Sequence, residues 1–373
     1  MAARPSDIVV VGAGIVGCAV AYELARRGAS VELVDMREAG QGATQASAGM
    51  LAPYVEAREE NPLLELAVRS LEFYDQFIAS VSRDSGQPIP YKRTGTLEVA
   101  ADDNRMHRLR ATAGVLSRRG VDANLLDADA ARAEEPHLSR DVIGGLLIPS
   151  HGCVSAAILV SALASAARRH GAQILGHGAV RRVARDGDGM CIETDRGSLN
   201  GDGVVITAGS WSGSIEIEGS VERVPVRPVR GQLLQLRWAG PPLKRITWSE
   251  RCYLVPWDDG TLLVGATAEE AGFDERATAA GVHDLLDAAC ELVPHGWTAG
   301  FLGARVGLRP ASRDGLPIIG ASCAMPNLMY ATGHYRNGVL LAPVTAVLVA
   351  DAMLDHRVDA LLAAVSPSRF GGL

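Results

Sequence analysis

Residues 8–35 read IVVVGAGIVGCAVAYELARRGASVELVD, and this stretch decides the fold. A β-rich run over Asp7–Val11 leads into three closely spaced glycines. An apolar segment follows over Ile15–Arg27, and a second β-rich run covers Ser30–Asp35. The pattern predicts a strand, a helix and a second strand, which together form one βαβ unit. Such a unit opens the doubly wound α/β folds that bind dinucleotides.

The glycines of this stretch have the spacing GxGxxG and are Gly12, Gly14 and Gly17, with Ala13, Ile15 and Val16 between them. The first glycine permits a tight turn, the second lets the backbone approach a pyrophosphate, and the third lets the helix pack closely on the strand. The N-terminus of the helix favours the phosphate charge. Asp35 ends the second strand, where a carboxylate accepts hydrogen bonds from a ribose diol and repels the 2′-phosphate of NADP. We therefore predict a dinucleotide site, although this motif alone does not separate FAD from NAD.

Three further stretches favour FAD. Residues 40–51, GQGATQASAGML, are rich in small and hydroxyl side chains, and such a backbone can lie flat against a large planar ligand. Residues 331–340, ATGHYRNGVL, predict a strand, a turn between glycines and a helix whose N-terminus would stabilise negative charge on a reduced flavin. Residues 205–211, VITAGSW, predict a buried strand that ends in small residues. The first two stretches are each also compatible with an ordinary strand-to-helix connection.

Composition narrows the function further. A chain of 373 residues is long enough for two domains, and its net charge of −7 argues against a general nucleic-acid binder. Only Lys92 and Lys244 are lysines and no GxxxxGK[ST] loop occurs, which excludes a Walker-type NTPase and disfavours a pyridoxal-phosphate enzyme. The six cysteines are scattered without a CxxC pair, so the sequence shows no zinc or iron–sulfur spacing and predicts no metal site.

The apolar segments raise the question of export or membrane insertion. Arg4 followed by the uncharged residues 8–22 looks like the start of a signal peptide, but this run carries the glycine motif and continues as an amphipathic helix. Val339–Ala350 is shorter than the ~20 residues that span a bilayer, and Pro343 interrupts it. Together with thiols that suit a reducing compartment, these features predict a cytoplasmic protein without membrane insertion.

The rest of the chain alternates between α/β and mostly β character. Helices are predicted over Asn61–Ser82, Ser155–His170, Thr278–Leu292 and from Gly338 to about Leu354. Strands are predicted over Thr94–Ala100, Gly144–Ile148, Arg181–Asp195, Gly203–Thr207, Val224–Trp238, Tyr253–Thr267 and Leu328–Ala331, with a loop over Pro149–Val154. We predict an α/β (α+β) chain with a Rossmann-like nucleotide-binding domain and a second, mostly antiparallel β domain that binds the substrate. The first domain is assigned residues 1–84, 144–218 and 305–373, and the second 85–143 and 219–304.

The chain resembles the D-amino-acid oxidase family of FAD flavoproteins over nearly its whole length, and within this family it is most similar to the glycine oxidases of bacterial thiamine biosynthesis. The matching stretches are Gly12–Gly17, Thr44–Leu51, Val205–Ser212, Cys252–Pro256, Val264–Thr267, Gly307–Pro310 with Asp314–Gly315, and Gly333–Pro343. The resemblance implies the glutathione-reductase-like FAD fold and a homotetramer.

The resemblance also implies a set of substrate contacts. Arg309 matches the arginine that holds the substrate carboxylate, and a guanidinium suits this task because it pairs bidentately and stays charged. Tyr253 matches a tyrosine whose hydroxyl contacts the same carboxylate. Arg336 matches a residue beside the flavin and the substrate. For Arg336, a capping role or a contact with the flavin edge is nearly as well supported as a contact with the substrate. Met50 matches a residue of the pocket lining, which we place near Met50 and Ala268.

The cofactor contacts implied in the same way extend along most of the chain. They are Gly12, Ala13, Gly14, Ile15, Val16, Gly17, Asp35, Met36, Thr44, Ser47, Ala48, Gly49, Met50, Val180, Ala208, Gly209, Trp211, Arg309, His334, Arg336, Asn337, Gly338, Val339 and Leu340. The sarcosine oxidases of this family bind FAD covalently through a cysteine. Gly307 stands at that position here, so we expect non-covalent FAD.

The reaction implied is the oxidative deamination of glycine, sarcosine or small D-amino acids. With the carboxylate held by Arg309 and Tyr253, a hydride passes from the substrate Cα to flavin N5, and water hydrolyses the imine to an oxo acid and ammonia. Dioxygen then reoxidises the flavin and gives hydrogen peroxide. This route needs orientation and electrostatic stabilisation rather than an acid or base, and the sequence contains no convincing acid–base pair.

Three alternatives stay open at the level of sequence. A D-amino-acid dehydrogenase of the same fold would pass electrons to a quinone or another carrier instead of dioxygen. An NAD-dependent dehydrogenase would use the same glycine motif. A flavoprotein scaffold or FAD-binding regulator would carry out no reaction. The choice among small amines is also open, because one methylene in an apolar pocket is worth only ~1–3 kcal/mol.

Overall fold

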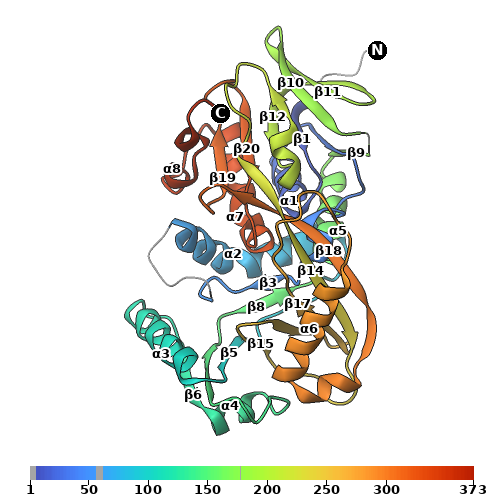
Figure 1. Cartoon of the computed structure of the whole chain (residues 1–373). Coiled ribbons are helices and arrows are strands. Elements are labelled where there is room, and N and C mark those ends of the chain that lie inside the picture. Colours follow the sequence, from blue (N-terminus) through green and yellow to red (C-terminus); the bar gives the residue numbers. More distant parts are fainter. Residues whose placement is uncertain (1–5, 56–61, 177) are drawn as a thin grey trace.

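The computed structural model describes residues 6–55, 62–176 and 178–373. The molecule consists of two domains placed one above the other, and the first described residues and the C-terminus lie in the upper one (Figure 1). Arg4 and Asn61, which figured in the sequence predictions, lie outside the described residues.

The upper domain is built on the predicted βαβ unit. Strand β1 (Ser6–Val11) leads through the glycine turn into helix α1 (Ile15–Arg26) and then strand β2 (Val31–Asp35), and β1 pairs in parallel with β2 and with β12 (Gly197–Ile206). The sheet has the strand order β13-β10-β11-β12-β1-β2-β9, and β20 joins it beside β12 and carries β19. The remaining bounds are β9 Gln173–Gly176, β10 Val180–Asp186, β11 Gly189–Thr194, β13 Glu216–Ile217, β19 Ile318–Ala321 and β20 Leu328–Thr332.

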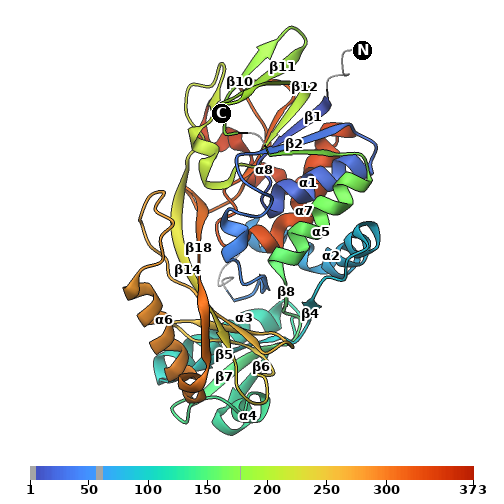
Figure 2. The same cartoon turned by 90° about the vertical axis from the view of Figure 1, so that its right-hand side faces the viewer.

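Four helices lie on one side of this sheet (Figure 2). Besides α1 these helices are α2 (Pro62–Ser85), α5 (Ala156–Arg169) and α7 (Gly338–Leu354). Three of them contact strands of the sheet, and α2 packs against α5 and α7. Their shared interface is apolar and fully buried, with Leu24, Leu66 and Leu163 at 0% exposure, so burial of these faces is the main stabilising term. Helix α2 also holds the first turn of α7, because the Tyr74 hydroxyl donates to the Val339 carbonyl at 3.1 Å.

The lower domain is an eight-stranded sheet with the order β18-β14-β17-β16-β15-β5-β7-β6, and only the β15–β5 pair is parallel. This confirms the predicted mostly antiparallel second domain. Its strands are β5 Thr96–Ala100, β6 Asn124–Asp127, β7 Gly144–Ile148, β14 Val226–Arg237, β15 Ile246–Trp248, β16 Tyr253–Pro256, β17 Thr261–Gly265 and β18 Gly300–Ser312. Its helices are α3 Asp103–Arg118, α4 Ala128–Glu134 and α6 Ala279–Leu292. Two short helices, α8 Leu362–Val365 and η4 Pro367–Phe370, end the chain, and η3 Pro294–Thr298 follows α6.

The long pair β14 and β18 connects the two domains (Figure 2). Both strands run from the eight-stranded sheet up to the short helix η2 (Gly209–Ser214), which follows β12 of the upper sheet. Residues near the C-terminal end of β18 therefore face groups from both domains, and Arg309 is one of them.

Two details differ from the sequence predictions. The expected loop over Pro149–Val154 is wrong in its second half, because Gly152–Val154 forms strand β8 between β3 (Met50–Leu51) and β4 (Tyr91–Lys92). Strand β7 begins the predicted segment 144–218 of the nucleotide domain but pairs with β5 and β6 in the lower sheet. The domain boundaries stay a proposal, and this pairing favours a start of the segment after Ile148.

In the part of the chain that the structure describes, no helix is both long and apolar enough to cross a membrane.

Candidate functional site

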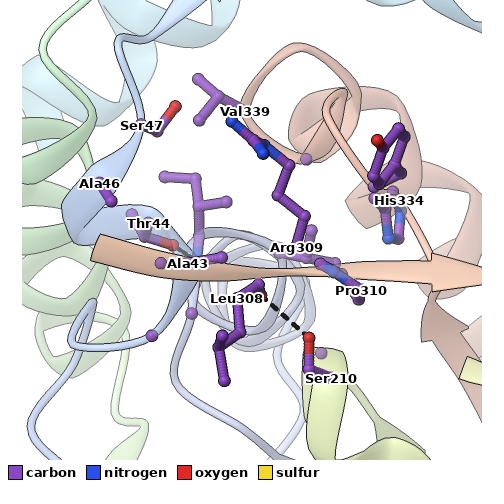
Figure 3. A pocket seen from close by; sticks show the side chains of 18 of the residues that line it. Ala43, Thr44, Ala46, Ser47, Ser210, Leu308, Arg309, Pro310, His334 and Val339 are labelled. Carbon is purple, nitrogen blue, oxygen red and sulfur yellow. Dashed lines mark hydrogen bonds between the residues drawn. The ribbon is translucent and has the colours of Figure 1, made fainter. Parts of the chain in front are cut away.

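A cavity of about 480 Å³ lies where the two domains meet. The turns after β1, β2, β12 and β20 form its upper walls, and β14, β16, β17 and β18 supply residues from the lower sheet. In Figure 3, Arg309 extends from its strand into this cavity, with Thr44 and Ser47 on one side and His334 on the other. Segments distant in sequence thus line one pocket.

The glycine turn shapes one end of the cavity. Gly12 has φ 109°, a conformation that favours glycine, and Gly14 lies on the cavity wall. A Cβ at Gly17 would overlap the carbonyl oxygen of Gly12, so this residue sets the close approach of α1 to the turn. Gly17 and Ala13 stand behind the wall rather than on it, and for Gly17 this agrees with a role in the packing of α1.

Asp35 anchors the same end of the cavity. Its Oδ2 accepts a hydrogen bond from the Ala13 amide at 2.6 Å, and its Oδ1 accepts one from the Arg37 amide at 2.8 Å. The carboxylate therefore joins the glycine turn to the chain after β2 while it lies on the cavity wall. A carboxylate held in this way suits the ribose diol that the sequence predicts for this position.

The chain after β2 forms a second wall. In the short helix η1 (Ala43–Ala46), the Thr44 hydroxyl accepts from the Ile15 amide at 3.0 Å, and farther along the Ser47 hydroxyl accepts from the Gly49 amide at 3.1 Å. A Cβ at Gly49 would overlap the backbone of Val154, so β8 holds this segment close. Met50 completes this wall.

The turn before α7 forms the wall opposite η1. Neither Gly14 nor Asn337, the N-cap residues of α1 and α7, caps its own helix with a side chain, and both helices open on the cavity; at α1 the Thr44 hydroxyl accepts from the first amide. The Arg336 guanidinium lies 5.4 Å from the centre of the Tyr335 ring. Two helix N-termini at one cavity favour a ligand with negative charge at two places.

His334 belongs to the same turn but is not an acid–base group at neutral pH. Its ring is buried, and burial lowers its pKa from 6.5 to about 4. Its Nε2 lies 3.1 Å from the Thr345 hydroxyl on α7. The neutral imidazole therefore joins the turn to the helix.

Two predicted substrate contacts project into the cavity from the lower sheet. The Arg309 Nη1 donates to the Thr267 carbonyl at 2.8 Å. The guanidinium lies against Gly231 of β14 and the Tyr253 ring lies against Gly265 of β17, since a Cβ at either glycine would overlap the neighbouring side chain. Both side chains thus depend on a glycine on an adjacent strand for their positions.

The structure brings together nearly all predicted site residues and adds others. With the exceptions of Ala13, Gly17 and Ala268, every residue predicted for the cofactor or the substrate pocket lines the cavity. Ala268 does not line it, and Ala266 does. Residues that the sequence analysis did not identify include Arg37, Trp248, Glu250, Arg251, Cys252 and Tyr335. For the connection between β15 and β16, the available signals were its position next to Tyr253 and the matching stretch that begins at Cys252.

The donor set fits a dinucleotide flavin. The cavity offers a glycine turn with a carboxylate at one end, a second helix N-terminus farther along, and a guanidinium and a phenol beyond it. Among the described residues, no cluster of three or more His, Cys, Asp or Glu side chains could hold a metal ion. The helix ends, the carboxylate and the guanidinium on the wall equip the site to bind and orient ligands.

Comparison with known proteins identifies the family. The model of the DAO family, described as FAD dependent oxidoreductase, matches residues 7–352. The glycine oxidase of Geobacillus kaustophilus is 33% identical over 347 residues, which cover 92% of either chain. A crystal structure of glycine oxidase from the same species superposes with a TM-score of 0.94 at 32% identity and covers 98% of this chain and 99% of that one.

Other relatives are longer than this chain, or their names give a substrate other than glycine. The bifunctional protein ThiO/ThiG of Synechocystis sp. is 36% identical over 372 residues, and this chain spans 54% of its length. A crystal structure of iminodiacetate oxidase from Chelativorans sp. superposes with a TM-score of 0.87 at 28% identity and covers 96% of this chain and 98% of that one. The family match overturns the NAD-dependent alternative. The chain belongs to the DAO family of FAD-dependent oxidoreductases.

Proposed function

We propose that the protein oxidises glycine and other small amines, among them sarcosine and small D-amino acids, in an FAD-dependent deamination that yields an oxo acid, ammonia and hydrogen peroxide. Relatives named glycine oxidase match over 92–95% of this chain at 29–33% identity and support this assignment. The proposal covers this chain alone, because the ThiO/ThiG relatives are about twice as long. A role in thiamine biosynthesis, implied by the resemblance, is part of the proposal.

The observation that carries the proposal is the placement of Arg309 and Tyr253 on one wall of the cavity that also receives the N-terminus of α7. Arg309 binds the substrate carboxylate bidentately, and the Tyr253 hydroxyl donates to the same group. Because both come from strands, the carboxylate is held by a rigid sheet and the substrate Cα is presented to the cofactor in a fixed direction.

When bound, FAD supplies a hydride acceptor at flavin N5. Gly12 and Gly14 would hold the pyrophosphate, Asp35 would hold the ribose, and Thr44, Ser47 and Gly49 would lie along the flavin. The first turn of α7, Gly338–Leu340, would stabilise negative charge on the flavin through its backbone amides. The neutral His334 supports this turn, since its Nε2 lies 3.1 Å from Thr345.

The finer points are proposed as well. FAD is held non-covalently, because Gly307 lines the cavity and the one cysteine on its wall, Cys252, is a buried thiol whose pKa is raised to about 11 by that burial. All six cysteines are free thiols, which supports a reducing compartment such as the cytoplasm. A homotetramer is proposed from the resemblance, and light scattering of the purified protein measures it.

The test is a screen of purified, yellow protein for peroxide release from glycine, sarcosine, D-alanine and D-proline. We expect peroxide in proportion to the amine consumed, with glycine among the good substrates. The dehydrogenase alternative, which the named relatives do not favour, predicts flavin reduction under anaerobic conditions but slow reoxidation in air without peroxide. A protein that takes up no FAD would refute the proposal.

A further inference from the structure

Glu269 lies in the connection between β17 and α6 and is not part of the cavity wall. Its carboxylate is nevertheless fully engaged. Oε1 accepts from the Thr267 hydroxyl at 2.6 Å and from Gln232 Nε2 at 2.8 Å. Oε2 accepts from Arg230 Nη2 at 2.5 Å and from its Nε at 3.2 Å.

The residue that Glu269 holds is the one that orients Arg309. Thr267 is fixed on three sides: its amide donates to the Gln232 carbonyl at 3.3 Å, its hydroxyl accepts from the Gln232 amide at 2.9 Å, and the same hydroxyl donates to Glu269. Its remaining polar atom, the carbonyl oxygen, accepts from Arg309 Nη1 at 2.8 Å. The direction of this carbonyl therefore follows from the bonds of the Thr267 amide and hydroxyl.

The charge of Glu269 is maintained by its surroundings. Burial alone would raise the pKa of this carboxyl, but hydrogen bonds from Thr267, Gln232 and Arg230 outweigh it and hold the pKa below its ordinary value. The Arg230 side chain is only 8% exposed and also pairs with Asp274 at 3.0 Å. Asp274 thus shares Arg230 with Glu269, and no bond joins it to Thr267 among those found in the described residues. This difference provides a matched control.

We propose that Glu269 is a positioning residue for substrate recognition: through Thr267 it sets the direction in which Arg309 presents its guanidinium to the substrate carboxylate. The inference rests on the proposed function, which makes Arg309 the carboxylate anchor. It adds a residue outside the cavity whose effect falls on carboxylate affinity and not on cofactor binding. Rigid support of this kind matters because small misplacements of a binding group are costly.

The experiment compares Glu269→Ala, Glu269→Gln and Asp274→Asn as FAD-loaded proteins. It measures KM and kcat for glycine, and the Kd of glycolate, which has the substrate's carboxylate but no amine, from the change in the flavin spectrum. The Kd of FAD and the Tm are measured in parallel. We expect Glu269→Ala to raise the glycolate Kd and the glycine KM about tenfold, with a smaller change in kcat and the FAD Kd unchanged.

The other variants separate positioning from general stability. Glu269→Gln keeps an oxygen that accepts from Thr267, so it should restore most of the glycolate affinity. Asp274→Asn should change the glycolate Kd by less than about twofold, because Arg230 retains its hydrogen bonds to Glu269. Equal effects of Glu269→Ala and Asp274→Asn, or an unchanged glycolate Kd in Glu269→Ala, would overturn the inference.

Two further results complete the design. If Glu269→Ala does not fold, Thr267→Val removes the same hydroxyl bond and keeps the carbonyl. It should weaken glycolate binding in the same way, and wild-type affinity in this variant would reject the inference. If the wild-type protein neither oxidises glycine nor binds glycolate, the proposed function itself fails. This result differs from an active wild-type protein in which Glu269 substitutions leave the glycolate Kd unchanged, which overturns the inference alone.

Discussion

The guanidinium of Arg309 lies directly against the backbone of Gly231 on the neighbouring strand, in space that a Cβ at Gly231 would occupy. The side chain expected to bind the substrate thus depends on the absence of another side chain. The obstructing atoms belong to the flexible end of Arg309 rather than to the backbone, so a substitution at Gly231 displaces Arg309 before it disturbs the fold.

This relationship predicts the effect of Gly231→Ala. The methyl group should push the guanidinium aside and raise the KM for glycine about tenfold, while FAD stays bound and Tm changes little. Steady-state kinetics and a thermal melt measure both effects. Gly300→Ala on β18 is the control, because its Cβ would meet Arg237 at an ordinary 3.5 Å. Equal kinetics for the two variants would contradict the prediction.

Removal of the guanidinium itself should have a larger effect. Arg309→Ala should lower kcat/KM for glycine by about a hundredfold or more, chiefly through KM, since a charged pair in a desolvated site is lost. Arg309→Lys should recover only part of this, because an ammonium does not bind bidentately. Arg305 on the same strand bonds Gln235 at 2.7 Å outside the cavity, so Arg305→Ala should keep near-normal kinetics. A normal KM in Arg309→Ala would disprove the assignment.

Gly17 should tolerate no side chain. A Cβ there would overlap the Gly12 carbonyl and crowd the Thr207 hydroxyl, and backbone cannot move aside as a long side chain can. We expect Gly17→Ala to lower the free energy of unfolding by more than about 3 kcal/mol and to abolish FAD uptake. Chemical denaturation and flavin absorbance test both. Gly176→Ala, where nothing lies within 4 Å, should behave like the wild type.

Acid should destabilise the protein through His151. This ring is fully buried, stacks on Tyr54 at 5.5 Å, and has its pKa lowered from 6.5 to about 3 by burial and, to a lesser extent, by Arg93. Between these two pH values the unfolded chain binds a proton that the folded chain does not, so stability falls as pH falls. A single group of this kind contributes a slope of about 1.4 kcal/mol per pH unit.

His151→Phe keeps a ring against Tyr54 but cannot titrate, so it should remove about one proton from the pH dependence of unfolding below pH ~6. Urea midpoints at a series of pH values measure the slope. His283→Gln is the control, because the His283 side chain is 79% exposed. An acid slope as steep as that of the wild type would argue against the prediction.

Denaturation should release the flavin. Because Cys252 is a buried thiol with a pKa raised to about 11, it forms little thiolate, and Gly307 offers no attachment atom. Protein unfolded in acid or urea should pass all its yellow colour through a membrane that retains the chain. Colour that stays with the chain would show a covalent bond.

The sequence alone predicted the features that depend on neighbouring residues. The spacing of Gly12, Gly14 and Gly17, the acidic end of β2 and the turn before α7 are local requirements of backbone geometry and helix ends, so the residue types reveal them directly. The mostly antiparallel character of the second domain followed in the same way from strand patterns and breaks. The resemblance to a known family then added Arg309 and Tyr253, which neither spacing nor periodicity would single out.

Tertiary structure decided what surrounds those residues. Gly231 lies under Arg309, Glu269 acts on Thr267, and the connection between β15 and β16 lines the cavity only because β14 and β18 extend from one domain into the other. Strand β7 belongs to the lower sheet because it pairs with β5 and β6, and its own residues do not reveal these partners. Contacts of this kind depend on strand register and domain packing, and the energy that selects them is shared among many residues distant in sequence. A local pattern therefore encodes the glycine turn, whereas the support of the substrate site exists only in the folded chain.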